Sequence, residues 1–482
     1  MTFFKFIFSP ANRKLLLWIT AFHILIAILF HWAYPFTIYF HDTPNYFLSA
    51  KMKHFYGYRP YGYSGFINFC IGVNQSIYSV VFFQSLAYPI ANVLFIFTIE
   101  YLFPFNNKKL LIWLAVLISL GGQQFMLTNV LISDSIFISL TLVWMVCILH
   151  ILKNEKTNYF LIIFYAFVCY GAAKTRYAGL IYPFIGLVVA AILFRKSYMK
   201  LFINALVSLI LFFFIYKQGV KENKDLCGIE TFSAFGGWAK LNNASVIIPE
   251  VKGEMPLRKL ADIHSFFKLF PDSTYSPSRV LTGQLMWNKL SPEKQYMNKC
   301  LLDRPQFGYL PMYVSLGKIY GEYGDALIKN NLSTFITRFY APNIRNVIFP
   351  KYDDITGYLN RPVDESTRKV CATDFDYFVP RNDIYKKYIT WWVQIRYFIL
   401  TLAFILAVVF LHIIKKIKPG PEYKKILYFI YIFFICNSAF LAYAHPITMR
   451  YLLTNEFIFA TAIFIIIDHL FYPGAIKSKA KK

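Results

Sequence analysis

The chain alternates between long apolar stretches and short connections that carry much of its positive charge. A helix that crosses the hydrocarbon core of a bilayer, about 30 Å thick, needs about 20 mostly apolar residues. Stretches close to this length lie at 15–36, 77–103, 110–128, 130–151, 158–174, 178–194, 199–217, 390–414, 426–444 and 450–473. The pattern predicts an all-α polytopic membrane protein with about 10 transmembrane helices.

The connections between these stretches predict the orientation of the helices. If the N-terminus is cytoplasmic, the cytoplasmic connections all carry lysine or arginine; they are 104–109, 152–157, 195–198, 415–425 and the basic C-terminal tail. Cytoplasmic loops of membrane proteins show such an excess of basic residues. We therefore expect both termini in the cytoplasm. The first apolar stretch is too long for a signal peptide and lacks a small-residue cleavage site, so we expect it to remain as an anchor.

This topology predicts three regions. An N-terminal membrane module of about seven spans covers 1–217 and contains a first outer loop at 37–76. An extracytoplasmic domain covers 218–389, where glycine and proline punctuation indicates a mainly helical unit with many loops. A C-terminal membrane module of about three spans, with the basic tail, covers 390–482.

Composition agrees with a membrane protein and argues against a nucleic-acid partner. Hydrophobic residues make up 57% of the chain and charged residues 16%, whereas soluble domains carry about 25% charged residues. The net charge is +25, but 27 of the 50 basic residues and only 7 of the 25 acidic residues lie outside 218–389. The excess therefore belongs to the membrane modules. The 7 cysteines show neither a CxxC pair nor zinc-site spacing, which favours free thiols.

Three acidic residues of the membrane modules, Asp42, Asp134 and Glu456, fall on or near the outer side. An ionisable group at membrane depth is costly and usually marks a functional site. Asp42 follows the first span and Asp134 opens the fourth, so the two carboxylates could converge on one cavity. One could act as a general base while the other orients a sugar or holds a metal ion. The alternative for each is a helix N-cap.

Basic residues on the predicted outer side form a complementary set, because the orientation rule disfavours them there. They are Arg59, Lys174, Arg176 and Arg450. Arginine offers paired donors to a phosphate, so we interpret the set as candidates for binding the phosphate of a lipid-linked substrate. The alternative is that each side chain reaches ordinary anionic headgroups. His264 in the outer domain is a weak candidate metal ligand beside a carboxylate.

The order of these motifs resembles the C-type glycosyltransferase superfamily (GT-C), in particular its protein mannosyltransferase-like and aminoarabinose-transferase-like branches. The matching features are the acidic motif from Asp42 to Tyr46, the Arg59-Pro-Tyr61 segment, Asp134 at the start of a span, Arg176 to Pro183, and Arg450-Tyr-Leu452. Family members often carry paired acids at the second position, whereas Ser133 precedes Asp134 here. This departure weakens a metal site at Asp134.

The resemblance implies an inverting sugar transfer at the outer membrane face from a polyprenyl-phosphate-linked donor. Asp42 would be the catalytic base, and the four basic residues would stabilise the departing phosphate. Tyr46, Tyr61 and His445 are further substrate-site candidates. Membrane lipid is an expected partner, and a divalent metal ion stays open, with Asp134 and His264 as its candidates. The acceptor is a protein, a glycolipid or a polysaccharide.

Two other classes of protein fit parts of the pattern. A polysaccharide polymerase or ligase also combines many spans, outer arginines and a large outer loop, but a site based mainly on arginine would not need the Asp42 motif. A multi-pass transporter often shows repeated halves, and the sequence contains no visible repeat. The lack of an evident disulfide framework or retention signal favours a bacterial inner membrane, and thus a role in the cell envelope.

Overall fold

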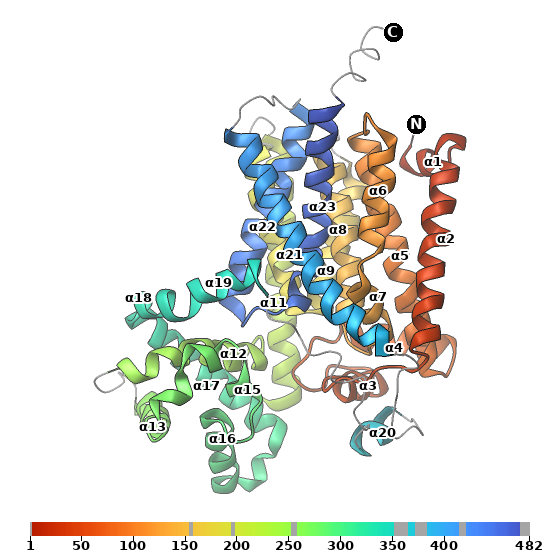
Figure 1. Cartoon of the computed structure of the whole chain (residues 1–482). Coiled ribbons are helices and arrows are strands. Elements are labelled where there is room, and N and C mark those ends of the chain that lie inside the picture. The colour runs from red at the N-terminus through yellow and green to blue at the C-terminus, as the bar shows by residue number, and fades with distance from the viewer. Residues whose placement is uncertain are drawn as a thin grey trace.

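The computed structural model describes residues 2–153, 158–193, 198–251, 258–350, 365–371, 383–413 and 421–472. These residues form helices joined by loops, without a strand of a sheet; an isolated bridge joins Ile38 and Val130. The described chain has an all-α polytopic membrane fold, as the sequence predicts. It consists of an upright helical bundle and a smaller helical domain that projects from one end of the bundle (Figure 1).

Each predicted span coincides with a helix or a helix pair. The bundle is built from α2 (Pro10–Ala33), α5 (Ile77–Leu102), α6 (Lys108–Ser119), α7 (Gly122–Asn129), α8 (Asp134–Lys153), α9 (Tyr159–Thr175), η1 (Tyr177–Leu180), α10 (Ile181–Leu193), α11 (Tyr198–Cys227), α21 (Asp383–Ile413), α22 (Pro421–Ala444) and α23 (Met449–Phe471). A short α1 (Phe3–Ile7) precedes α2.

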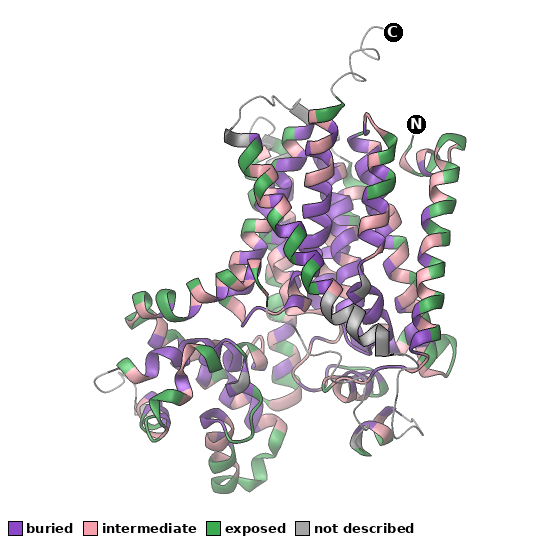
Figure 2. Cartoon of the chain, in the orientation of Figure 1, coloured by how far each residue is buried: buried purple, intermediate pink, exposed green. Residues whose placement is uncertain are grey.

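Not all of these helices are equally long. Among the described residues, 7 helices are long and apolar enough to cross a membrane alone, and the α6–α7 pair makes 8 if it counts as one span bent by 46°. α9 and the η1–α10 segment are apolar but shorter than the others. Burial differs as well: α8 and α23 are mostly buried inside the bundle, whereas α2 lies at its edge with most residues exposed to lipid (Figure 2).

The projecting domain has its own core. Its helices are α12 (Ala234–Ala244), η2 (Ser245–Glu250), α13 (Arg258–Phe267), η3 (Asp272–Tyr275), α14 (Pro277–Val280), α15 (Gln284–Trp287), α16 (Pro292–Asp303), η4 (Pro305–Phe307), α17 (Tyr309–Asn330), α18 (Leu332–Phe335), η5 (Ile336–Tyr340) and α19 (Ala341–Ile348). Trp238 is fully buried in this core; its ring stacks on Tyr313 at 4.6 Å, and its indole N–H donates to the Tyr313 carbonyl at 3.1 Å.

The first loop region closes the end of the bundle nearest this domain. It contains α3 (Thr43–Met52) and α4 (Gly62–Val73), and the short α20 (Glu365–Cys371) packs against α3. Backbone hydrogen bonds join Ile38 to Asn129 and Leu131 to Ile38, each at 3.0 Å. This pairing holds the start of the first loop beside the residues that precede α8. As a result, two segments about 90 residues apart in the chain meet at one place.

Candidate functional site

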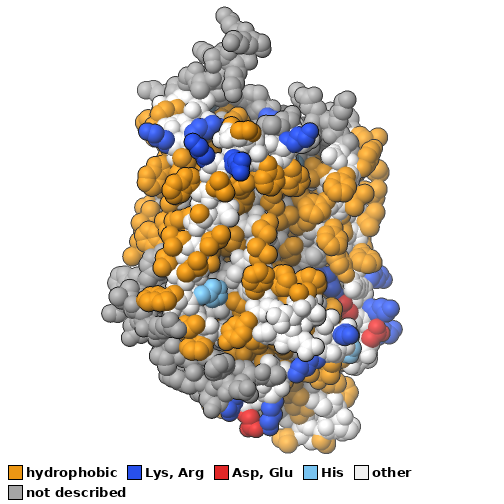
Figure 3. Space-filling view, turned by 90° about the vertical axis from the view of Figure 1, so that its right-hand side faces the viewer, with side chains coloured by type: hydrophobic (Ala, Val, Ile, Leu, Met, Phe, Trp, Pro, Cys, Tyr) orange, Lys and Arg blue, Asp and Glu red, His pale blue; other side chains and the backbone are white. Residues whose placement is uncertain are grey.

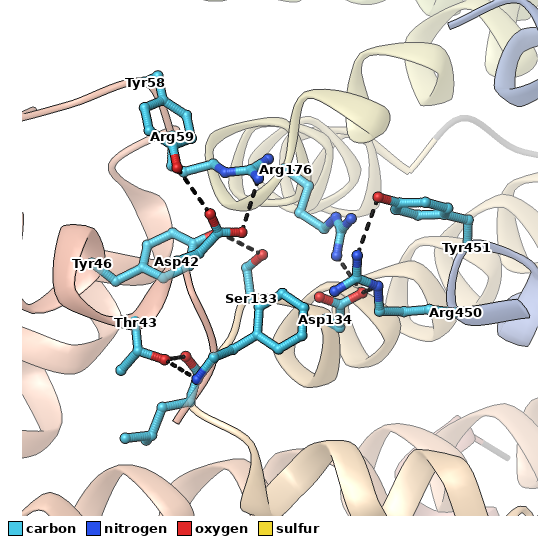
Figure 4. A network of polar contacts seen from close by, with 12 residues as sticks. Asp42, Thr43, Tyr46, Tyr58, Arg59, Ser133, Asp134, Arg176, Arg450 and Tyr451 are labelled. Carbon is cyan, nitrogen blue, oxygen red and sulfur yellow. Dashed lines mark hydrogen bonds and ion pairs between the residues drawn. The ribbon is translucent and has the colours of Figure 1, made fainter. Parts of the chain in front are cut away.

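The pairing at Ile38 places Asp42 and Asp134 on two adjacent segments. Thr43 strengthens the junction, because its hydroxyl donates to the Leu131 carbonyl at 2.9 Å and accepts the Phe40 N–H at 2.8 Å. The Tyr46 hydroxyl lies 3.1 Å from the Ser133 hydroxyl and links α3 to the same segment. These contacts fix the geometry of both carboxylates (Figure 4).

Asp42 is held by two side chains of the first loop. Its carboxylate forms an ion pair with Arg59 at 2.8 Å and accepts a hydrogen bond from the Tyr58 hydroxyl at 3.2 Å (Figure 4). Burial raises the pKa of Tyr58, so the phenol remains a donor. Asp42 stands at the N-cap position of α3 but makes no side-chain capping bond. Its carboxylate is therefore used for side-chain contacts and not for capping.

Asp134 opens α8 and meets two arginines from different helices. It forms an ion pair with Arg176, which follows α9, and lies 3.7 Å from the Nε of Arg450 at the start of α23. Tyr451 lies beside both guanidinium groups, each at 5.1 Å from its ring centroid. The Asp134 carboxylate thus fixes the directions of two arginines that come from distant parts of the chain (Figure 4).

A cavity of about 240 Å³ joins the two carboxylates. It is lined by Asp42, Tyr46, Arg59, Ser133, Asp134, Arg176, Phe235, His445, Arg450 and Tyr451, among others. The lining includes three guanidinium groups and two carboxylates, and burial lowers the pKa of His445 to about 4, so His445 is neutral near pH 7. One positive charge is left over. Such a cavity favours an anion, and phosphate matches the donor geometry of arginine.

The projecting domain, which the sequence predicts to be extracytoplasmic and which we call the outer domain, completes this cavity. Phe232, Ser233, Phe235 and Gly236, at the start of α12, all line it. The Phe235 ring lies 4.7 Å from the Arg59 guanidinium carbon, which is a cation–π contact. No chemical feature of the sequence predicted this segment at the site, because its residues carry no charge. Tyr58, Ser133 and Tyr451 each stand next to a predicted site residue in the sequence, and this position was the main feature that could have identified them.

The structure does not bring every predicted site residue into the cavity. Lys174 lies at the end of α9, and its ammonium group binds Glu222 of α11 at 2.5 Å. Tyr61 precedes α4 and is outside the lining. Gly62, which follows it, packs directly on the Lys174 backbone.

The two candidate metal ligands lie apart. His264 is in the outer-domain core, with its Nδ1 at 2.7 Å from the Tyr323 hydroxyl, and Asp134 is bound by two arginines. The described residues contain no group of three or more histidine, cysteine or acidic side chains suited to a metal ion. These two residues therefore do not fit a shared metal site.

The third outer acid, Glu456, has a different setting. It is buried in α23, where it forms an ion pair with Arg396 of α21 at 3.1 Å and accepts a hydrogen bond from Gln124 of α7 at 2.9 Å. It is absent from the cavity lining. Glu456 ties three helices of the bundle together, further along α23 than Arg450.

Comparison with known proteins gives little to add to this geometry. No protein-family model matches the chain, and no curated protein matches it. Among solved structures, the chain is similar to the crystal structure of ArnT from Cupriavidus metallidurans bound to undecaprenyl phosphate. The two are 10% identical, with a TM-score of 0.33, over 97% of this chain and 79% of that chain. The residues of the cavity therefore carry the functional interpretation.

Proposed function

We propose that this protein is a glycosyltransferase of the GT-C type that transfers a sugar from a polyprenyl-phosphate-linked donor to an acceptor at the outer face of the membrane. The observation that carries the proposal is the cavity itself, in which Asp42 and three arginines meet at the end of the bundle where the outer domain begins. A lipid-linked donor needs both surroundings side by side, because its tail requires apolar helices and its phosphate requires buried cations.

Asp42 is the proposed catalytic base. Its carboxylate accepts the proton of an acceptor hydroxyl, whose oxygen attacks the anomeric carbon of the sugar. The bond from that carbon to the phosphate oxygen breaks, and the phosphate leaves with the bonding electron pair. Because the acceptor oxygen attacks from the face opposite the phosphate, the anomeric configuration is inverted. Arg59 and Tyr58 hold the Asp42 carboxylate in place through the contacts described above.

Arg176 and Arg450 are the proposed ligands of the leaving phosphate. Both line the cavity, and Asp134 directs them into it. Donors fixed in advance stabilise developing charge without reorganisation, and each contributes about 3 kcal/mol in comparable sites. Asp134 is thus a positioning residue in this proposal. His445 is neutral at the rim and can donate or accept a hydrogen bond to a sugar hydroxyl.

The proposal also assigns the sides of the membrane. The cavity and the outer domain face away from the cytoplasm, as the basic connections predict. Both termini lie in the cytoplasm, and the compartment is a bacterial inner membrane. The cavity takes residues from all three regions: Asp42 from 1–217, Phe235 from 218–389 and Arg450 from 390–482.

Transfer of radiolabelled sugar tests this function. Membranes with the wild-type protein are incubated with a panel of polyprenyl-phosphate sugars and a membrane extract as the source of acceptors. We expect label transfer, and we expect Asp42→Asn to lower it by at least about 100-fold, because a positioned base contributes that much. Asp325→Asn is the matched control, since Asp325 is an exposed carboxylate of the outer domain that binds Lys240 at 2.7 Å. Full transfer by a folded Asp42→Asn protein would remove Asp42 as the base.

A polysaccharide polymerase or ligase is the second candidate. It is favoured by the convergence of Arg59, Arg176 and Arg450 on one cavity, which would also suit the diphosphate of a lipid-linked oligosaccharide. The same assay separates the two. Label transfer from an oligosaccharide diphosphate donor, with none from any monosaccharide donor, would support this second candidate.

A further inference from the structure

A second cavity, of about 940 Å³, lies between α2 and α6 at the end of the bundle where α2 begins and α23 ends. α2 lines it with Leu15, Trp18 and Phe22, which repeat at helical spacing, and α6 lines it with Ala115 and Ser119. Its volume is at the upper end of the range of about 300–1,000 Å³ for pockets that enclose a small ligand. None of its lining residues lines the Asp42 cavity. We call it the α2–α6 groove.

The groove exists because α2 packs loosely. Only Ile19, His23, Phe30 and Ala33 of this helix are buried, and Trp18 is 75% exposed. On the α6 side, the small side chains of Ala115 and Ser119 lie one turn apart and leave space between the two helices. Apolar walls next to a bilayer fit hydrocarbon chains.

The mouth of the groove is strongly basic. Lys14 and Lys108 line it, exposed Arg13 and Lys109 adjoin them in the chain, and exposed Lys5 adjoins the lining residue Phe6. Figure 3, which looks at the side of the bundle that carries α2, shows lysine and arginine side chains at the upper end above a broad hydrophobic band, and basic side chains mixed with acidic ones at the lower end. The positive charge at the upper end therefore lies where the apolar walls of the α2–α6 groove end.

An acidic group near the mouth offsets part of this charge, and the rest remains. Glu100 is the acidic residue among the described lining; it forms an ion pair with Lys108 and accepts the Phe105 N–H at 3.2 Å. Asp468 accepts the free N–H groups of Asn106 and Asn107 at the start of α6, both at 2.9 Å. Both carboxylates are thus used inside the protein, and the exposed basic side chains of Arg13, Lys14 and Lys109 carry the remaining charge around the mouth.

We propose that the α2–α6 groove binds an anionic phospholipid of the leaflet on this side of the membrane. Its acyl chains lie between Leu15, Trp18 and Ala115, and its phosphate lies at Lys14 and the neighbouring basic residues. Charge complementarity favours this occupant over a second copy of the chain, which would bring the same positive charges to the contact. The inference is independent of the reaction proposed above.

The position of α2 gives the bound lipid a structural consequence. α2 ends at Ala33, and the backbone pairing of Ile38 and the Asp42 loop follow within ten residues. A phospholipid that fills the groove bridges α2 to α6 and so supports the helix that enters the first loop. A ligand that binds the folded protein also raises its thermal stability, by an amount that grows with the logarithm of its concentration once the site is mostly filled.

Native mass spectrometry of the purified protein, titrated with phosphatidylglycerol or with phosphatidylcholine, tests the proposal. We expect the wild type to retain phosphatidylglycerol in preference to phosphatidylcholine and to unfold at a higher temperature with it. Each lysine removed, in Lys14→Gln and Lys109→Gln, should weaken phosphatidylglycerol binding about fivefold, because a basic side chain near anionic lipid contributes about 1 kcal/mol.

A filling variant and a matched control complete the experiment. Ala115→Trp should block the groove and abolish binding of the bound phospholipid, and the two lysine variants test the site even if this variant fails to fold. Lys424→Gln removes an exposed basic residue of α22 that does not line the groove and should bind like the wild type. Equal retention of both lipids, equal loss in Lys424→Gln, or a dimer that excludes lipid from the groove would overturn the proposal.

Discussion

Asp134 shows how one residue of the cavity acts through its neighbours. Its side chain is 6% exposed, and it is the carboxylate shared by Arg176 and Arg450. Removing one partner of a buried ion pair leaves the other charge uncompensated, at a cost of about 3–5 kcal/mol. The structure therefore gives Asp134 a larger part in stability than Asp42, whose partner Arg59 is 22% exposed.

We predict that Asp134→Asn lowers the free energy of unfolding by about 3 kcal/mol, whereas Asp42→Asn lowers it by less than half of that. Thermal unfolding of the purified variants in detergent measures both effects, and transfer activity is measured on the same samples. If Asp134→Asn unfolds like the wild type, the two arginines are held by contacts other than the carboxylate.

Glu293 links stability to pH at a second residue. Its carboxyl group is fully buried in the outer domain, and burial raises its pKa from 4.5 to about 7. The folded protein therefore binds a proton between pH 4.5 and 7 that the unfolded chain has released. By linkage, the contribution of this group to stability is favourable at low pH and is lost as the pH rises through 7.

We predict that Glu293→Gln stabilises the outer domain above pH 7 by about 3 kcal/mol relative to the wild type and has little effect near pH 4.5. Unfolding temperatures measured between pH 5 and pH 9 test this. Glu322→Gln, on the adjacent helix α17, is the comparison variant. A wild-type profile that does not decline between pH 5 and pH 7 would contradict the burial of a neutral carboxyl group.

The sequence predicted the cavity residues unevenly, for physical reasons. A charge at the outer end of an apolar span is costly and usually has a function. This criterion identified Asp42, Arg59, Asp134, Arg176 and Arg450. Lys174 met the same criterion but binds Glu222, an acid that the sequence placed in the outer domain. The structure extends α11 to Cys227, so Glu222 belongs to a helix beside α9. Pairing between helices cannot be read from charge and position alone.

At the scale of elements, the closest helix contact is between α12 and α17. Gly237 faces the backbone of Gly317, and a Cβ atom at either position would collide with the carbonyl group of the opposite helix. Glycine is needed here for the close approach, not for a special backbone angle. The contact brings Trp238 onto Tyr313 and so fixes the start of α12, whose Phe235 lines the cavity.

We predict that Gly237→Ala destabilises the outer domain by about 1–3 kcal/mol, as overpacking does, and lowers transfer by displacing Phe235. Gly321→Ala of α17 is the matched control, since a Cβ atom there would meet only the Gly237 Cα at 3.5 Å and Gly321 does not line the cavity. Limited proteolysis of the outer domain, together with the activity assay, measures both effects. Equal protease resistance of the two variants would show that the helices can separate at little cost.

The elements themselves were predicted well because apolar length is a strong signal. The break between α6 and α7 was missed, and 110–128 was predicted as one span. The pair bends where Gly121 and Gly122 are followed by Gln123 and Gln124. Mean hydropathy conceals such a break. The break itself is explained by packing, because Gln124 turns inward to Glu456, which also binds Arg396. That partner is more than 300 residues away in the chain.

At the scale of the whole molecule, the two ends of the bundle differ in chemistry. One end carries the start of α2, the end of α23 and the basic groove mouth, and the other carries the Asp42 cavity and the outer domain (Figure 1). Basic residues favour the cytoplasmic side, so the distribution of charge predicts an orientation that the fold alone does not contain. The proposed reaction depends on this orientation, because a donor sugar must be presented at the outer face.

We predict that a membrane-impermeant maleimide modifies a cysteine placed at Leu269 in intact cells but modifies one placed at Lys424 only after the membrane is opened. Leu269 is 78% exposed in the outer domain, and Lys424 is exposed at the opposite end of the molecule. Both cysteines are introduced into a chain with Cys227, Cys300 and Cys436 changed to serine, since these three native thiols are only partly buried. The reverse labelling pattern would place the cavity in the cytoplasm, and the proposed outer-face transfer would then be wrong even if Asp42 is the base.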